Sequence, residues 1–261
     1  MTPGAVDSPF ASAGRAVRNS LRVRARRTQS ARGIPGEPGN LGAARLLRSA
    51  AGVTPIELPR PRLSAGKSVA EGLRRRRTIR EIRDKNLPLQ LLSNLLWAAC
   101  GVNRPKKKGP FNGVGITAAS ASNSQEIDVF VALESGIYLF DAVLQRLQPV
   151  LSRDLRFMAI SPGQKNVTMK APVELLYVVD IDRLVHTSGF QEPGLQDPEI
   201  QKSYYFVDTG LIAGNVYLFA ASQGLAAWFH NCDRTGLSRE LKLRPEQRLL
   251  FAQSVGYPSR R

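Results

Sequence analysis

The spacing of apolar and polar residues changes near residue 63. From there to residue 258, apolar positions recur with helical or strand periodicity, whereas the earlier part is rich in Ala, Arg, Gly, Ser and Pro. A segment of that composition buries too little apolar surface to offset the entropy lost on folding. The sequence therefore predicts a disordered basic extension over residues 1–62, ending in an extended strap (residues 55–61), and one folded domain over residues 63–261.

Four stretches of the predicted domain have helical periodicity. A short helix is expected over residues 67–77. A second helix is expected to open at Pro88 and to end at Gly101, because a proline suits the first turn and a glycine the end. The longest predicted helix covers residues 204–224, and a last short one covers residues 235–241.

Strand patterns alternate with these helices. Residues 127–133 alternate in polarity, and the turn Ser135-Gly136 predicts a hairpin with residues 137–140. Residues 172–180 are almost continuously apolar, which is typical of a central strand covered on both faces. Further strands are predicted over residues 225–230 and 248–257. Residues 102–118 and 182–202 are expected to be loops, and residues 141–156 partly helical.

The mixture of helices and strands shows no βαβ regularity. It predicts an α+β fold with one central mixed β-sheet flanked by helices. Two cysteines, Cys100 and Cys232, make no disulfide framework, so a reduced, cytoplasmic setting is expected. No apolar run approaches the roughly 18 residues that a bilayer requires, so no membrane partner is expected. The Arg/Ser-rich, acid-poor start leaves organellar targeting or export as alternatives.

Basic residues are concentrated in the first two-fifths of the chain. The net charge is +16, of which residues 1–66 contribute +8 (11 basic, 3 acidic), residues 67–108 contribute +9 (12 and 3) and residues 109–261 contribute −1 (14 and 15). A nucleic-acid binder usually carries its charge across its fold and interleaves aromatic residues. Binding to an anionic surface is therefore an alternative supported by charge alone, and nucleic acid is not an expected partner.

The commonest catalytic motifs are absent from the sequence. There is no P-loop, no GxGxxG after a strand, no GxSxG and no HExxH. The two histidines, His186 and His230, have no ligand companions at useful spacing, so no metal site is predicted. What remains is an arginine-rich run at residues 74–80 and a Ser/Asn/Gln-rich stretch at residues 120–125. Arginine presents a rigid, permanently charged fork that matches phosphate oxygens.

Five motifs, in order, carry a resemblance to a known family. They are Arg76-Arg77-Thr78-x-Arg80, the helix LSNLLWAACGVNRP, the loop SxxNSQE running into IDVFVAL, the strand APVELLYVVD with the helix DTGLIAGNVYLFAASQGL, and the closing LLFAQSVGYP. Together they cover about residues 65–258. The chain resembles the flavin-dependent nitroreductase superfamily, and more narrowly its branch of azoline-oxidising dehydrogenases of the SagB/ThcOx type.

The resemblance implies a nitroreductase-like fold, an intertwined homodimer and FMN at the dimer interface. NADH or NADPH would supply two electrons, which would pass through flavin N5 to a nitroaromatic, a quinone or a similar small organic acceptor in a ping-pong reaction. Because the flavin carries this chemistry, no side chain is assigned as catalytic. A nitroreductase fold that binds flavin without nicotinamide turnover is the closest alternative.

The cofactor-binding residues follow from the same resemblance. Arg76, Arg77 and Thr78 match the motif that holds the FMN phosphate and ribityl oxygens, and Arg80 matches a basic position near the flavin pyrimidine edge. Arg74 and Arg75 lie outside the motif and are expected to be a solvated helix end. The remaining implied contacts are Ser120, Asn123 and Gln125, often from the partner subunit, and Phe229, His230 and Asn231. A C-terminal basic residue completes the phosphate site in many relatives, but neither Arg260 nor Arg261 is assigned that role here.

Overall fold

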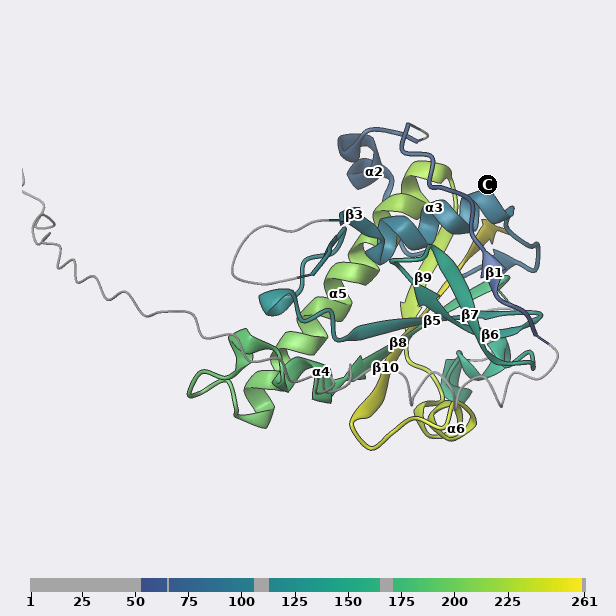
Figure 1. Cartoon of the computed structure of the whole chain (residues 1–261). Coiled ribbons are helices and arrows are strands. Elements are labelled where there is room, and N and C mark those ends of the chain that lie inside the picture. Colours follow the sequence, from purple (N-terminus) through teal and green to yellow (C-terminus); the bar gives the residue numbers. More distant parts are fainter. Residues whose placement is uncertain (1–52, 65, 106–112, 165–170, 260–261) are drawn as a thin grey trace, which may run out of the picture. The chain divides into compact units, whose positions relative to one another are not determined.

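The computed structural model describes residues 53–64, 66–105, 113–164 and 171–259 of the chain (Figure 1). Residues 1–52 of the expected extension, and Arg260 and Arg261, lie outside the described residues. The strands of the main sheet are β1 (Ile56–Glu57), β2 (Ile82–Arg83), β5 (Ile127–Leu133), β6 (Gly136–Asp141), β7 (Arg146–Leu151), β8 (Val173–Asp180), β9 (Ala226–His230) and β10 (Gln247–Pro258). A separate hairpin pairs β3 (Val102–Arg104) with β4 (Gly115–Ile116).

The described helices are α2 (Val69–Arg75), α3 (Leu89–Cys100), α4 (Ile181–Val185), α5 (Pro198–Gln223) and α6 (Arg234–Glu240). Short 3-10 turns lie at η1 (Ala121–Asn123), η2 (Arg156–Met158), η3 (Pro162–Gln164) and η4 (Ser188–Phe190). The expected short helix near residue 70, the helix after Pro88, the long helix before Gly224 and the helix near residue 238 are therefore all confirmed.

The strand order of the sheet is β1-β7-β6-β5-β8-β10-β2, and β9 pairs with β10 on the same side as β2. Every described pairing in this sheet is antiparallel, so the expectation of a mixed sheet was wrong. The crossover through α5 does make β8 and β9 parallel to each other. However, β10 lies between them and pairs antiparallel with both, so no parallel ladder forms.

β8 is the central strand, as its continuous apolar run predicted. All eight of its residues are buried, because both faces of the sheet are covered. Leu175 and Tyr177 belong to the core cluster that contains apolar residues of α3 and α5, whereas Leu176 and Val178 belong to the cluster that contains Leu237 of α6. The sheet thus lies between α3 and α5 on one face and α6 on the other (Figure 1).

Three segments predicted as loop or helix differ in the structure. Residues 102–118 were expected to be a loop, but β3 and β4 lie there and pair with each other. Residues 141–156 were expected to be partly helical, but β7 occupies residues 146–151 and pairs with β6. Residues 182–202 were expected to be a surface loop, but α4 and the start of α5 lie there. Each of these helices begins at a capping aspartate, since Asp180 accepts from the Arg183 N–H and Asp197 from the Glu199 N–H.

The strap before α2 belongs to the folded part. β1 pairs with β7, the side chain of Leu58 is buried, and the Arg62 N–H donates to Asn94 of α3 (2.9 Å). The folded part therefore begins before residue 63, the boundary expected from composition. Composition did not predict that the strap is ordered, because its residues are polar and proline-rich. They are held by hydrogen bonds to α3 and β7 rather than by their own apolar content.

Candidate active site

The arginine segment, defined as residues 76–80, begins where α2 ends. Arg76 is the C-cap of α2, and its N–H donates to the carbonyl oxygen of Gly72. Three residues later, the Ile79 N–H donates to the Ala227 carbonyl oxygen at 3.1 Å. The segment therefore runs from a surface helix to β9 and places Thr78 and Arg80 beside that strand.

The two arginines before this segment have a different environment. Arg74 and Arg75 occupy the last turn of α2, and both bind the carboxylate of Glu71 one turn earlier. The hydrogen bonds from Arg74 and then Arg75 lower the pKa of Glu71 to about 2. Arg74 and Arg75 are therefore occupied by a carboxylate of their own helix, as expected for a solvated helix end.

Arg76, Arg77 and Arg80 are exposed, and none of them has a carboxylate within ion-pair distance among the described residues. The Arg76 guanidinium lies 5.7 Å from the centre of the Tyr217 ring, and the Arg80 guanidinium lies 5.8 Å from that of Trp228. Such cation–π contacts orient a guanidinium without occupying its N–H donors. The segment therefore presents three cations whose donors can bind an anion.

Tyr217 of α5 links the arginine segment to β9. Its hydroxyl accepts from the Phe229 N–H at 2.8 Å and lies 3.2 Å from Thr78 Oγ1. Since the Phe229 amide donates to the tyrosine oxygen, the hydrogen of the Tyr217 hydroxyl can point at Thr78. The Thr78 hydroxyl hydrogen is then directed elsewhere and can donate to a ligand oxygen.

The polar loop, defined as residues 120–125, holds three of the predicted cofactor-binding side chains. The side-chain amides of Asn123 and Gln125 both donate to the Val114 carbonyl oxygen, at 3.2 and 2.7 Å. Ser120 Oγ accepts from the Gln125 N–H at 3.2 Å. These side chains therefore already make hydrogen bonds within their own chain, and the loop is held in one shape by them.

The predicted residues after α5 lie at the end of β9. Phe229 is half-buried against Phe251, with 4.8 Å between the ring centres, and Asn231 is exposed with its Oδ1 accepting from Arg234. The prediction for His230 needs a correction, because its side chain is fully buried. Side chains alternate along a strand, so the imidazole and the Phe229 ring lie on opposite faces of β9, and Asn231, after the strand, is exposed. Only the backbone of His230 remains for a ligand.

The buried imidazole of His230 is part of a hydrogen-bonded chain. His230 Nδ1 lies 2.9 Å from the Asn231 carbonyl oxygen and Nε2 lies 2.8 Å from Ser254 Oγ, which in turn lies 2.8 Å from a carboxyl oxygen of Glu174. Burial lowers the pKa of His230 to about 4 and raises that of Glu174 to about 8.

His230 and Glu174, the two titratable groups of this hydrogen-bonded chain, are therefore both neutral near pH 7. A carbonyl oxygen can only accept, so Nδ1 of His230 carries the hydrogen and Nε2 accepts from Ser254. Ser254 then accepts from protonated Glu174, and every buried group has a partner. The chain supports Trp228, whose ring centre lies 4.2 Å from that of His230, and through Trp228 it supports Arg80.

The two parts of the candidate site contact opposite halves of α5. The arginine segment meets α5 at Tyr217, whereas the Ala121 N–H of the polar loop donates to Asp208 at 2.9 Å. Nine residues separate these two positions, which corresponds to about 14 Å along a helix that rises 1.5 Å per residue. Within one chain, the arginine segment and the polar loop are therefore separate surfaces.

Sequence reasoning missed Tyr217, Trp228 and Asp208, which support these two surfaces. Tyr217 and Asp208 lie in the long helix that contributed to the resemblance, but nothing in the local pattern distinguishes them from other helix residues. Their partners are 139 and 87 residues away in the sequence. Trp228 directly precedes the predicted contact Phe229, and this position in the sequence was the one available signal.

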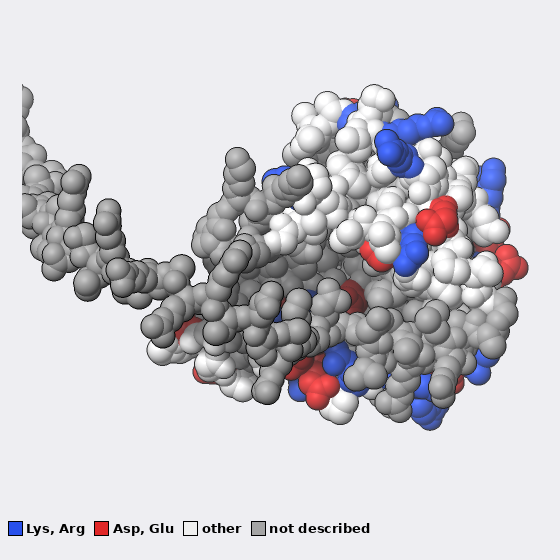
Figure 2. All heavy atoms as spheres, in the orientation of Figure 1, with Lys and Arg blue, Asp and Glu red and all other residues white. Residues whose placement is uncertain are grey.

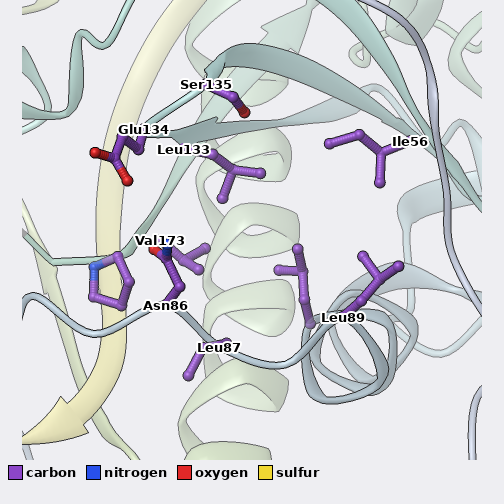
Figure 3. Close-up of a pocket in the computed structure, with 10 residues that line it drawn as sticks. Ile56, Asn86, Leu87, Leu89, Leu133, Glu134, Ser135 and Val173 are labelled. Atoms are coloured by element: carbon purple, nitrogen blue, oxygen red, sulfur yellow. The ribbon is translucent and has the colours of Figure 1, made fainter.

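A cavity of about 400 Å³ lies elsewhere in the molecule. Its lining is mostly aliphatic, and the side chains of Ile56, Leu89 and Leu133 face a common space, with Glu134 at the edge (Figure 3). None of the residues that line it is basic, so this cavity does not suit an anionic cofactor.

On the face shown in Figure 2, basic and acidic side chains of the described residues are interspersed rather than gathered into one continuous basic track. In the described parts of the chain, no group of three or more potential ligands could hold a metal ion. No helix found there is both long and apolar enough to cross a membrane.

The family model for the nitroreductase family matches residues 73–257. The chain belongs to the nitroreductase family. This nitroreductase-family enzyme is similar to a solved nitroreductase homologue from Ralstonia eutropha JMP134, with 31% sequence identity and a TM-score of 0.67; the match covers 79% of this chain and 90% of that one.

Two more distant structures share the fold. The NADPH:FMN oxidoreductase of Vibrio harveyi, solved with NAD+, matches with 18% identity and a TM-score of 0.51 over 74% of this chain and 69% of that one. A chain of the microcin synthetase complex of Escherichia coli matches with 17% identity and a TM-score of 0.57 over 85% and 84% of the two chains. The nitroreductase-like α+β fold, with a central sheet flanked by helices, is thereby established.

Proposed function

We propose that this nitroreductase-family enzyme binds FMN and transfers two electrons from NADH or NADPH to a small organic acceptor. The observation that carries the proposal is the arginine segment, in which Arg76, Arg77 and Arg80 are free of carboxylate partners among the described residues. A phosphate needs such a set of unoccupied, charge-bearing donors.

The residues of the segment fit the parts of FMN in order. Arg76 and Arg77 would bind the phosphate, and the Thr78 hydroxyl, oriented by Tyr217, would donate to a phosphate or ribityl oxygen. Arg80, held over Trp228, would lie near the pyrimidine edge and stabilise negative charge there. Bound in this way, FMN would supply the two-electron chemistry between a reduced nicotinamide and the acceptor.

The proposal includes a homodimer, because α5 presents an exposed apolar stripe. Val207 is 59% exposed and Leu211 is 43% exposed, and they lie one turn apart. At the neighbouring Gly210 and Gly214, an added Cβ would meet no atom within 4 Å, so another backbone can approach closely there. A stripe of this kind marks an interaction surface rather than a solvated face. We assign it to a second copy of this chain.

Two-fold pairing across this stripe would complete the site. Such an axis would place the C-terminal half of one α5 against the N-terminal half of the other. The arginine segment contacts Tyr217 and the polar loop contacts Asp208, which lie on either side of the stripe's centre. The arginine segment of one subunit would then face Ser120, Asn123 and Gln125 of the polar loop in its partner.

The class of electron acceptor is the most specific part of the proposed function. The motifs of the sequence resemble the SagB/ThcOx-type branch of azoline-oxidising dehydrogenases, and the fold match to a chain of a microcin synthetase complex is in keeping with that branch. Nitroaromatics, quinones and oxidisable azolines are the acceptors or substrates to compare. No side chain is assigned to proton transfer, and Phe229 and Asn231 would line the ring beside the acceptor.

The decisive experiment measures the flavin directly. The purified protein, or the protein reconstituted with FMN, should show flavin absorbance in the blue region, and NADH or NADPH should bleach it under nitrogen. A protein that takes up no FMN at micromolar concentrations would refute the proposal. Bound FMN that neither nicotinamide bleaches would instead indicate a flavin-binding protein without nicotinamide turnover.

A further inference from the structure

The backbone of the polar loop adopts a conformation that ordinary residues avoid. Ser122, Asn123 and Gln125 have φ angles of +51°, +58° and +50°, and none of them is a glycine. The left-handed region costs an L-residue about 1 kcal/mol or more. Three of the four residues 122–125 have this backbone conformation, so other interactions must stabilise it. The partners in these interactions are the groups that determine the shape of the loop.

Two of the hydrogen bonds that hold the loop are accepted by buried carboxyl groups. These two carboxyl groups belong to different elements. The Ala121 N–H donates to Asp208 Oδ2 of α5 at 2.9 Å. The Ser124 hydroxyl donates at 2.6 Å to Oε2 of Glu126, the residue directly before β5. Glu126 is 0% exposed and Asp208 is 4% exposed, so neither carboxyl group exchanges its partners with bulk water. The shape of the loop therefore depends in part on these two acids, beside the bonds of Asn123 and Gln125 to Val114 and of Arg183 to the Gln125 carbonyl oxygen.

The two carboxyl groups are close enough to influence each other, and one of their oxygens lacks a donor. Glu126 Oε1 is buried and has no hydrogen-bond partner among the described residues. Burial, and secondarily the charge of Asp208, raises the pKa of Glu126 to about 7, and burial also raises the pKa of Asp208. Two ionised carboxylates without a cation between them would be costly in this environment.

The surrounding charges do not neutralise the pair. Arg183 of α4 is the described cation that acts on Glu126, and its Nη2 already binds Asp128 at 2.9 Å. The same nitrogen lies 3.7 Å from Asp180, which also binds Arg244. Arg183 is therefore shared among Asp128, Asp180 and the Gln125 carbonyl oxygen, to which its Nη1 donates at 2.7 Å. Among the described residues no donor reaches Glu126 Oε1, and a proton on the carboxyl pair would satisfy it.

We propose that Glu126 and Asp208 are positioning residues that hold one proton between them, and that this proton keeps the polar loop in the shape that meets the cofactor. Protonated Glu126 donates to Asp208, and Asp208 still accepts from the Ala121 N–H. Loss of the proton leaves two adjacent anions, which separate and pull on Ala121 and Ser124. The part concerning the cofactor rests on the proposed function, whereas the shared proton does not.

The shared proton can be tested on the protein without FMN. In samples labelled with ¹³C at Asp and Glu carboxyl carbons and with ¹⁵N at alanine, NMR should show a carboxyl titration near pH 7. The Ala121 amide shift should move with the same midpoint. The isosteric Glu126→Gln variant, whose amide replaces the proton permanently, should abolish both changes. Titration of both carboxyl groups below pH 5 would overturn the proposal.

The role toward the cofactor is tested by FMN affinity between pH 6 and 8.5. If the protonated pair favours FMN binding, the bound cofactor should raise the pKa of the pair, and a rise of one unit corresponds to a factor of ten in affinity. The ratio of the wild-type dissociation constant to that of Glu126→Gln should therefore rise about tenfold over this range. The ionisation of the FMN phosphate affects both proteins equally and cancels in this ratio. Glu192→Gln, at an exposed position, is the matched control and should follow the wild type.

The outcomes separate the two proposals. A constant ratio with normal FMN binding would refute control of the cofactor by the shared proton and leave the proposed function intact. Failure of both wild type and Glu126→Gln to bind FMN would refute the proposed function. In that case, the NMR titration still decides whether Glu126 and Asp208 share a proton.

Discussion

The arginine segment and the polar loop are built in opposite ways, although both were expected to contact one cofactor. In the arginine segment, the charged side chains are exposed, and aromatic rings rather than hydrogen bonds orient Arg76 and Arg80. In the polar loop, the side-chain amides of Asn123 and Gln125 are bound to a carbonyl oxygen of their own chain. One surface has its donors available, and the other has its shape fixed.

The difference extends to the buried acids below each surface. Under the arginine segment, Glu174 ends a chain through Ser254 and His230 in which every group has a partner. Under the polar loop, Glu126 has an oxygen to which none of the described residues donates, and the second acid Asp208 lies nearby. The arginine segment therefore has a stable support and a surface ready for an anion, whereas the polar loop has its conformation tied to protonation.

The largest effect is expected when the two surfaces are separated. Leu211→Glu places a charge in the centre of the proposed dimer stripe, where it would be buried without a partner, twice per dimer. Each unpaired buried charge costs several kcal/mol, so dimer dissociation should increase about 1,000-fold or more. Analytical ultracentrifugation should show a folded monomer, and FMN should be lost with the dimer. Leu211 is exposed in the single chain, so the monomer itself should fold.

Val143→Glu is the matched control for this substitution. Val143 is also a large exposed apolar residue, 67% exposed in the turn between β6 and β7, away from α5. It should leave both the oligomeric state and FMN binding unchanged. A Leu211→Glu protein that remains dimeric would show that another surface forms the dimer.

The next largest effect is expected within the arginine run. Arg76→Ala with Arg77→Ala removes two charged donors from the proposed phosphate site, and charge-assisted hydrogen bonds contribute about 1.5–3 kcal/mol each. FMN affinity, followed by fluorescence quenching, should fall about 100-fold or more. Riboflavin, which lacks the phosphate, should lose much less.

The same run supplies a control of equal charge change. Arg74→Ala with Arg75→Ala removes two arginines that are occupied by Glu71, so FMN affinity should change less than about threefold. Equal losses in the two double variants would mean that general charge attraction, rather than a specific site at Arg76 and Arg77, binds the cofactor.

A smaller effect is expected at Tyr217. Tyr217→Phe keeps the ring under Arg76 but removes the hydroxyl that orients Thr78 and accepts from the Phe229 N–H. FMN affinity should fall about tenfold, the size of one hydrogen bond. In a double-mutant cycle with Thr78→Val, the two losses should be clearly less than additive. Full additivity would show that Tyr217 supports β9 without orienting Thr78, and Tyr257→Phe is the control for loss of a tyrosine hydroxyl.

Local pattern was sufficient for much of the fold. The apolar run of β8 predicted a central strand because a strand covered on both faces carries mostly apolar residues. The local pattern did not predict β7, because Arg146, Gln148 and Pro149 interrupt the alternation of polar and apolar residues. This strand is stabilised by its pairing with β6. The start of α5 was missed because its first turns are polar, and a capping aspartate followed by Pro198 sets its beginning.

The candidate site was less accessible from the sequence than the fold. The split of the arginine run could be predicted, because Arg76, Arg77 and Arg80 belong to a family motif and Arg74 and Arg75 do not. His230 was predicted to contact the cofactor, but its position in the alternation along β9 leaves its side chain buried. Asp208 and Glu126 lie within two of the quoted motifs, but nothing there indicated that they interact, since a contact between two acids from different elements depends on tertiary packing.

The smallest effect concerns Glu174, the acid with a complete set of partners. Its pKa is raised to about 8 by burial, so the folded protein binds a proton that the unfolded chain releases above about pH 4.5. This contribution to the free energy of unfolding is fully present at low pH and is lost as the pH rises toward 8. Between pH 6.5 and 8, where His230 is neutral in the folded state and its titration in the unfolded chain is common to the wild type and the Gln variant, the wild type should lose on the order of 1 kcal/mol. Urea unfolding at the two pH values measures this loss. Glu174→Gln, which keeps a donor for Ser254, should lose markedly less, and an equal loss in both proteins would show that Glu174 is ionised in the native state.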